Sequence, residues 1–195
     1  MDFRRVWTSA PLMAALLLGA CGDGASSAPR KALAERRAAL ENAIASNPKV
    51  IVERVELARV AIEMGDGVGA EAAVKGALGA GAKEAALRPL LARAYAMQDE
   101  GSRALETLGD GPIIPEMIGE AAWVAGDVHL GNGDLDAARE AYDRAVRELP
   151  RSSALWVDVA RFRDANADVL GARDAVDYAI ELDKTNGAAL AFKAN

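Results

Sequence analysis

Small and large apolar residues recur along most of the chain at a fixed interval of 34 residues. Two columns contain only alanine or glycine: Ala58, Ala92, Gly126 and Ala160, and Ala70, Ala104, Ala138 and Ala172. Two further columns hold mostly larger residues: Val74, Leu108, Tyr142 and Val176, and Leu57, Leu91, Ala125 and Val159. A period of this length, without insertions, indicates that one supersecondary unit is repeated and stacked.

Each unit is predicted to contain two amphipathic helices joined by a turn. The first helix of one unit runs through Leu57 and ends at Gly65-Asp66, where the glycine can adopt the left-handed conformation of a C-terminal cap. The second helix of another unit extends over 135–149 and stops before Pro150, and Asp134 or Asp136 can cap its amides. The helices of a unit should therefore form an antiparallel hairpin.

The small columns have a geometric explanation. Two helices approach closely only where one of them carries Ala or Gly at the crossing, while larger residues fill the space between crossings. The arrangement resembles the tetratricopeptide repeat: a small residue after a Leu in the first helix, a small one early in the second, then a large one. Residues 126–150 match it best, and the resemblance extends from about Ala32 to the end. It implies an all-α fold, a right-handed superhelical stack of antiparallel helix hairpins (a TPR-like α-solenoid).

The period divides the chain into units. We expect a capping helix over 32–48, four hairpins over 51–84, 85–118, 119–152 and 153–186, and the start of an incomplete fifth repeat over 187–195. In the second hairpin, the residues from Leu108 to Pro112 should end the second helix early. The open fifth unit leaves a second interpretation, in which these repeats precede the catalytic domain of a larger enzyme or processing protein.

The first 20 residues have the features of a secretory signal peptide. Arg4 and Arg5 are followed by 15 almost uncharged residues, fewer than the roughly 20 that a membrane-spanning helix needs. Residues 18–21 read Leu-Gly-Ala-Cys and resemble the lipobox of bacterial lipoproteins. That resemblance implies cleavage before Cys21 and a lipid on its sulfur. Residues 21–31 are small and polar, and we expect them to form a flexible tether.

The same resemblance implies an address in the cell envelope. Gly22 follows the cysteine where an Asp tends to retain proteobacterial lipoproteins in the inner membrane, so the outer membrane is favoured, with the repeats facing the periplasm. The alternatives are an ordinary signal peptide with a chance cysteine, and a cytoplasmic adaptor with a chance leader. A fatty-acid label on Cys21 distinguishes them.

Charge and composition exclude several function classes. The formal net charge of −6 disfavours nucleic acid, whose binding depends on neutralising phosphates. A single Cys and a single His, His129, argue against a disulfide, a Cys- or His-rich metal site and a catalytic triad. We expect no cofactor, no metal and no enzymatic activity, and a packing role for His129.

Three other motifs have simpler explanations than chemistry. Gly131 to Gly133 resembles a phosphate loop but lies between two helices, where turn formation explains it. Asn132, Asp134 and Asp136 alternate as in a calcium loop, yet the glycine that should follow is replaced by Ala137. Asp164 and Asp168 are one helical turn apart and are expected on a solvated face.

The most plausible binding surface is the inner face of the stack, which the first helices line in this family. On this inner face, arginines share one column of the repeat and lie beside apolar side chains. Such a combination is suited to binding an acidic or extended peptide. Alternatively, these arginines form local ion pairs. The Lys and Asn residues with which chaperone-binding members clamp a carboxylate are absent from these columns, so that activity is not implied. We expect a protein or peptide partner in envelope assembly, secretion or exopolysaccharide export. The predicted groove residues are Val55, Arg59, Arg93, Trp123, Val157 and Arg161.

Overall fold

The computed structural model describes residues 24–194, and this part of the chain contains ten α-helices, one short 3-10 helix and no strand. The all-α prediction is confirmed. None of these helices is long and apolar enough to cross a membrane. In chain order the helices are α1 (Gly24–Ser46), α2 (Val52–Glu63), α3 (Gly67–Gly79), α4 (Glu84–Ala96), α5 (Gly101–Gly109), η1 (Pro115–Met117), α6 (Ile118–Gly131), α7 (Leu135–Glu148), α8 (Ser153–Ala165), α9 (Val169–Leu182) and α10 (Gly187–Ala194).

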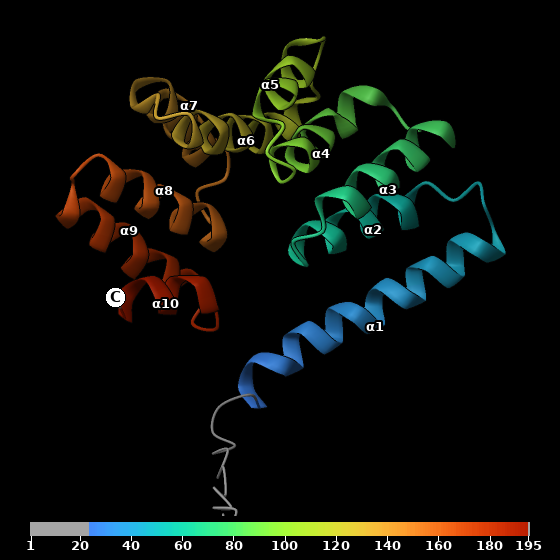
Figure 1. Ribbon diagram of the computed structural model, residues 1–195, viewed down its shortest axis with the longest axis horizontal. Coiled ribbons are helices and arrows are strands. Elements are labelled where there is room, and N and C mark those ends of the chain that lie inside the picture. Colours follow the sequence, from blue (N-terminus) through green and yellow to red (C-terminus); the bar gives the residue numbers. More distant parts are fainter. Residues whose placement is uncertain (1–23, 195) are drawn as a thin grey trace, which may run out of the picture.

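The helices form consecutive hairpins that follow one another around an arc, with α1 and α10 at its two ends (Figure 1). The pairs α2–α3, α4–α5, α6–α7 and α8–α9 are the four hairpins. Each first helix also contacts the first helix of the next hairpin, and each second helix contacts that same helix. The first helices α2, α4, α6, α8 and α10 are therefore neighbours along the stack, as an α-solenoid requires.

The turn inside each hairpin repeats in backbone detail. One residue just after each first helix has a positive φ: 77° at Gly65, 61° at Asp99, 76° at Gly133 and 60° at Ala167. These four residues are 34 apart. Only glycine adopts this conformation without a steric cost. The geometry of the turn is thus preserved even where the sequence does not supply the best residue.

An acidic residue follows each of these turns and caps the second helix in three of the four hairpins. The carboxylates of Asp66, Asp134 and Asp168 accept hydrogen bonds from the backbone amides three residues later, at 2.7, 3.1 and 2.9 Å. Such a bond satisfies one of the free amides of a helix N-terminus. Glu100, at the same position before α5, makes no side-chain cap bond. Asp168 is therefore a cap and not only part of a solvated face.

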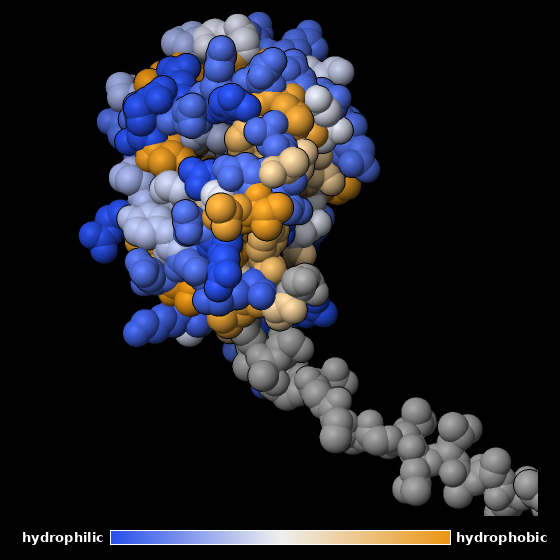
Figure 2. All heavy atoms as spheres, turned by 90° about the vertical axis from the view of Figure 1, so that its left-hand side faces the viewer, coloured by the Kyte–Doolittle hydropathy of each residue, from blue (hydrophilic) through white to orange (hydrophobic). Residues whose placement is uncertain are grey.

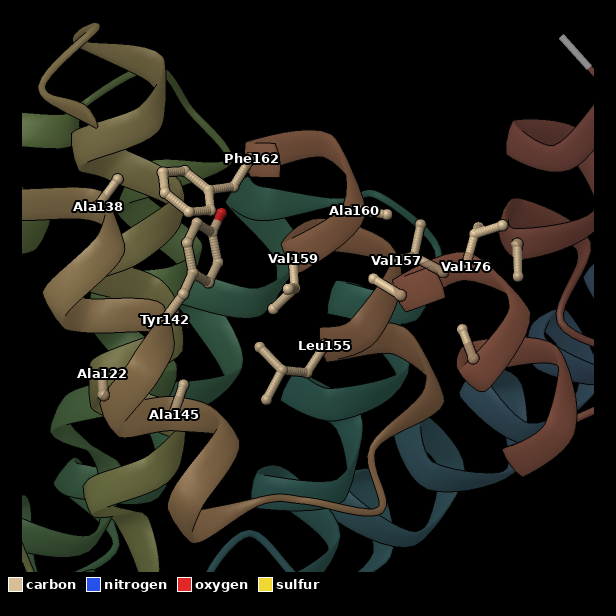
Figure 3. Close-up of a cluster of buried hydrophobic side chains, with 13 residues drawn as sticks. Ala122, Ala138, Tyr142, Ala145, Leu155, Val157, Val159, Ala160, Phe162 and Val176 are labelled. Carbon is tan, nitrogen blue, oxygen red and sulfur yellow. The ribbon is translucent and has the colours of Figure 1, made fainter. Parts of the chain in front are cut away.

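All eight residues of the two small columns are buried, as the stacking of helices at these positions requires. One buried cluster joins α6 to α10, and it contains Tyr142 and Phe162, whose ring centroids lie 5.4 Å apart (Figure 3). A Cβ atom on Gly126 would lie 2.9 Å from the ring of Tyr142. Gly126, the only glycine in its column, therefore faces Tyr142, the only tyrosine in the neighbouring column. The ring of Tyr142 occupies the space that an alanine methyl group would need.

Replacing Gly126 with Ala should lower the free energy of unfolding by about 1 to 3 kcal/mol, because the new methyl group overlaps a ring that cannot move freely. Gly131 on the same helix is the matched control, because a Cβ there meets nothing within 4 Å. The variant Gly131→Ala should be neutral or more stable. Urea unfolding followed by circular dichroism measures both, and equal effects at the two sites would contradict this account of the column.

The N-terminal segment differs from its expected form. A flexible tether was expected to reach residue 31, but α1 begins at Gly24, so residues 24–31 are helical. The segment that continues this helix, 30–46, consists largely of strong helix formers. The helix ends at Ser46, before Asn47-Pro48. The leader 1–20 and Cys21 lie outside the described residues.

α1 packs against α2 as the second helix of one hairpin packs against the first helix of the next. Leu33, Leu40 and Ile44 lie on one side of α1 and are half-buried. An ion pair of 2.7 Å joins Arg37 Nη1 to Asp66 Oδ2, at the turn between α2 and α3. Asp66 thus caps α3 and also holds α1. The backbone amide of Gly69 and the guanidinium of Arg37 lower the pKa of Asp66.

The second hairpin is the irregular one, as its sequence indicates. α5 has 9 residues, whereas the other second helices have 13 or 14. The chain then continues through an extended linker and η1 to reach α6 at Ile118. The amide of Ile114 donates a 3.2 Å hydrogen bond to the carbonyl of Ala85 at the start of α4. The linker is therefore attached to the first helix of its own hairpin.

At the C-terminal end, α10 contacts α8 and α9, so it occupies the place of the first helix of a fifth unit. On the face shown in Figure 2, hydrophilic side chains predominate and hydrophobic ones gather in small patches between them. The larger exposed hydrophobic side chains include Val169, Leu170, Tyr178 and Leu190, all on α9 and α10.

Candidate functional site

The first helices of the second and third hairpins are joined by a largely buried arginine. Arg93 on α4 points toward α6, where its Nε lies 2.8 Å from Glu120 Oε1 and its Nη1 lies 3.1 Å from Asp127 Oδ2. Only 13% of its side chain is exposed. Charge-assisted hydrogen bonds of this kind are stronger than neutral ones, and burial increases the electrostatic contribution. Arg93 therefore fixes the relative position of these two hairpins.

An aromatic ring extends the network to the fourth hairpin. The guanidinium carbon of Arg93 lies 4.2 Å from the ring centroid of Trp123, a cation–π contact. The indole Nε1 of Trp123 donates a 3.0 Å hydrogen bond to Asp158 Oδ2 on α8. Asp158 Oδ1 accepts a 2.5 Å hydrogen bond from Arg161 Nη1 on the same helix. One connected set of polar side chains therefore spans α4, α6 and α8.

Asp127 is the most perturbed carboxyl group of this network. Burial raises its pKa to about 6, the charge of Arg93 opposes that effect, and the charge of Asp158 adds to it. The hydroxyl of Tyr142 donates a 2.7 Å hydrogen bond to Asp127 Oδ1. Burial and the nearby Asp127 raise the pKa of Tyr142, so its hydroxyl keeps its proton at neutral pH. Asp127 connects the polar network to the aromatic core described above.

The raised pKa predicts how stability changes with pH. Because folded Asp127 binds its proton more tightly than the unfolded chain does, its contribution to stability is largest below pH 4 and decreases until pH rises past about 6. Relative to Asp127→Asn, the wild type should lose up to about 3 kcal/mol over this range, since one pKa unit corresponds to about 1.4 kcal/mol. Urea unfolding midpoints of the wild type and the variant at pH 4, 5, 6 and 7 measure this change. A difference in stability that stays the same at all four pH values would contradict the prediction.

A second feature of the inner face is an apolar pocket of about 530 Å³ between the first and second hairpins. α2 contributes Val55 and Arg59, and α4 contributes Leu90. The linker before α6 forms another wall with Ile114 and Met117. Its volume and mainly apolar lining fall within the range of binding pockets for small ligands and side chains.

The predicted groove residues do not form one continuous binding surface. Val55 and Arg59 line the pocket, whereas Arg93 and Trp123 belong to the polar network and Arg161 pairs with Asp158 on its own helix. Val157 is only 2% exposed and shares a buried cluster with Ala189 of α10, so it cannot line an open groove. The expectation for Val157 was wrong because α10 packs against α8. Two of the three arginines thus form local ion pairs.

Two contributions to this region were not identified from the sequence. The pair of Arg93 and Asp127 could have been found, because opposite charges one 34-residue period apart occupy the same place on adjacent first helices. The contribution of Ile114 and Met117 could not have been found from the sequence, because these residues lie where the repeat pattern is interrupted. Their position depends on how the linker returns to α4.

The motifs that were expected to be structural have structural surroundings. His129 Nδ1 lies 4.0 Å from Asp134 Oδ2, and Gly133 forms the turn between α6 and α7 with its positive φ. Asp134 caps α7. Among the described residues, no group of three or more His, Cys, Asp or Glu side chains is placed to hold a metal ion.

The family model described as a tetratricopeptide repeat-like domain matches residues 14–182. The chain belongs to this family. The match begins inside the segment expected to be a leader, at residue 14. The matched residues include α1 and the four hairpins. A comparison with curated proteins found no match.

Solved structures of the repeat family support the fold. TTC0263, a thermophilic TPR protein of Thermus thermophilus, is 19% identical with a TM-score of 0.68, covering 85% of this chain and 92% of its own. YrrB, described as a TPR protein with an unusual peptide-binding site, is 18% identical with a TM-score of 0.52, covering 88% and 89%. A chain of the APC/C hetero-tetramer Cut9-Hcn1 is 14% identical with a TM-score of 0.67, covering 83% of this chain and 32% of its own.

Proposed function

We propose that this chain is a membrane-anchored scaffold that binds a protein partner through the inner face of its first hairpins. A stack of TPR-like hairpins is a protein-interaction fold, which supports a scaffold role. The pocket beside Arg59 is the observation that carries the proposal, because it is apolar, lies on the inner face and includes a cation without a local ion pair among the described residues. Such a combination suits recognition of a protein segment.

The position of Arg59 distinguishes the pocket from the rest of the inner face. Arg93 is largely buried between Glu120 and Asp127 and has little capacity for a partner, and the exposed Arg161 pairs with Asp158 on its own helix. The expected partner is therefore bound at the N-terminal end of the stack, next to the end that the lipid would anchor.

The anchoring itself rests on the resemblance of residues 18–21 to a lipobox. Acylation at Cys21 would hold the repeats at a membrane surface, since each buried CH₂ contributes about 0.8 kcal/mol. We place the protein in the bacterial envelope, facing the periplasm and on the outer membrane, with a role in envelope assembly, secretion or exopolysaccharide export.

Cells grown with an alkyne analogue of palmitate should incorporate it into the wild-type chain and not into Cys21→Ser. The wild type should also sediment with membranes in high salt, and the variant should be released. Absence of label from the wild type would remove the lipid anchor from the proposal and leave the scaffold role to be judged by partner binding.

Partner binding is tested by reversing two exposed charges at the pocket, Arg59→Glu with Lys83→Glu. A partner crosslinked to the wild type in cells should be recovered at most one-tenth as well with this variant, because a cationic site becomes anionic. Arg139→Glu with Arg173→Glu, on the exposed faces of α7 and α9, makes the same change of charge away from the pocket. Equal losses in both variants would refute a role for the inner face.

A further inference from the structure

Arg59 and Arg93 occupy the same position in successive repeats, but their surroundings differ. Arg93 pairs with Glu120 and Asp127, which lie 27 and 34 residues ahead of it on the next first helix. The residues at the same offsets from Arg59 are Ala86 and Arg93. Between the first and second hairpins, the places of these two acidic residues are thus taken by the methyl group of Ala86 and a second cation, Arg93.

The aromatic contact differs in the same way. Trp123, 30 residues ahead of Arg93, places its ring over the guanidinium at 4.2 Å. The residue at this offset from Arg59 is Pro89, which is smaller and fully buried. Arg93 is therefore covered by two carboxylates and an aromatic ring from α6, and Arg59 receives no such contacts from α4.

The space beside Arg59 is apolar and has a rigid lining. Leu87 and Leu90 of α4 are 4% and 2% exposed and form a floor. Ile114 and Met117 form a wall that the hydrogen bond from the Ile114 amide to Ala85 holds in place. This wall exists because α5 is short and the linker continues across the start of α4. The pocket is a property of this irregular second hairpin.

The charges at the pocket are all positive. Arg59 and Lys83 are exposed, and neither makes an ion pair with any residue of the described chain. Within residues 24–194, no acidic side chain lines the pocket, although the chain as a whole has a formal net charge of −6. A ligand that complements this site carries a negative charge next to apolar surface.

We infer that the pocket binds a segment of a partner protein that supplies a carboxylate and, within one or two residues, a large apolar or aromatic side chain. The inference rests on the proposed function as a scaffold. The carboxylate pairs with Arg59 as Glu120 pairs with Arg93, and the apolar side chain fills the space above Leu87 and Leu90. An Asp or Glu side chain and the carboxylate of a chain terminus offer the same chemistry.

An array of heptapeptides tests this chemistry with the full-length chain. Two central positions, either adjacent or separated by one residue, run through all twenty amino acids, and each peptide is made with a free and with an amidated C-terminus. Bound peptides should combine Leu, Ile, Met, Phe, Tyr or Trp with a carboxylate one or two residues away. Binding of the amidated forms only when they contain Asp or Glu identifies a side-chain carboxylate, whereas loss on amidation identifies a chain terminus.

Two variants tie the binding to Arg59. Arg59→Ala should weaken the selected peptide about tenfold, the effect expected for losing one charged hydrogen bond. Ala86→Glu should weaken it at least as much, because the introduced carboxylate stands where Glu120 stands relative to Arg93 and occupies Arg59 itself. Arg139→Ala on α7 should leave the affinity unchanged. Fluorescence anisotropy with the selected peptide measures all three.

The inference is overturned if no peptide binds, if binding does not require a carboxylate, or if Ala86→Glu binds as well as the wild type. A wild type that forms dimers and becomes monomeric on Ala86→Glu would also overturn it, since a second copy would then occupy the pocket. Partner recovery from cells separates this failure from that of the scaffold role. If the Ala86→Glu variant still recovers the partner, the scaffold role stands and only the role of the pocket in binding is removed.

Discussion

The fold depends on the exclusion of side-chain volume where helices cross. The two columns that repeat through the stack contain only alanine or glycine, and every one of these residues is buried. The larger side chains beside them then fill the space that the close approach leaves. Gly126 and Tyr142 show how tightly the two are matched, because a single methyl group on the first would overlap the ring of the second. Superhelical stacking follows from repeating this match every 34 residues.

The same period controls the electrostatics of the inner face. Residues one period apart lie side by side on adjacent first helices, so an arginine and an aspartate at that spacing form an ion pair, as Arg93 and Asp127 do. Where the period brings two arginines together, as at Arg59 and Arg93, no such pair forms and Arg59 is exposed. Charge pairing across the stack therefore decides which cations hold the structure together and which are accessible to a partner.

The apolar pocket arises where the regular pattern fails. The loss of a turn from α5 sends the linker back across α4, and this return builds a wall of the apolar pocket that includes Arg59. Between the second and third hairpins, Glu120 and Trp123 contact Arg93, the residue equivalent to Arg59. A repeat protein can thus gain a pocket by shortening one helix while the packing of the other repeats is retained.

The sequence by itself determined the helices, their pairing and the family, because small-residue columns, glycine turns and aspartate caps all act locally or at one fixed spacing. It also indicated that Val55 and Arg59 face inward. Only the tertiary structure decided that Val157 is covered by α10, that Arg93 and Trp123 hold the hairpins together, and that Ile114 and Met117 close a pocket. Burial, pairing and enclosure depend on which neighbouring segment reaches a side chain, and a repeat period does not specify this where the repeat is broken.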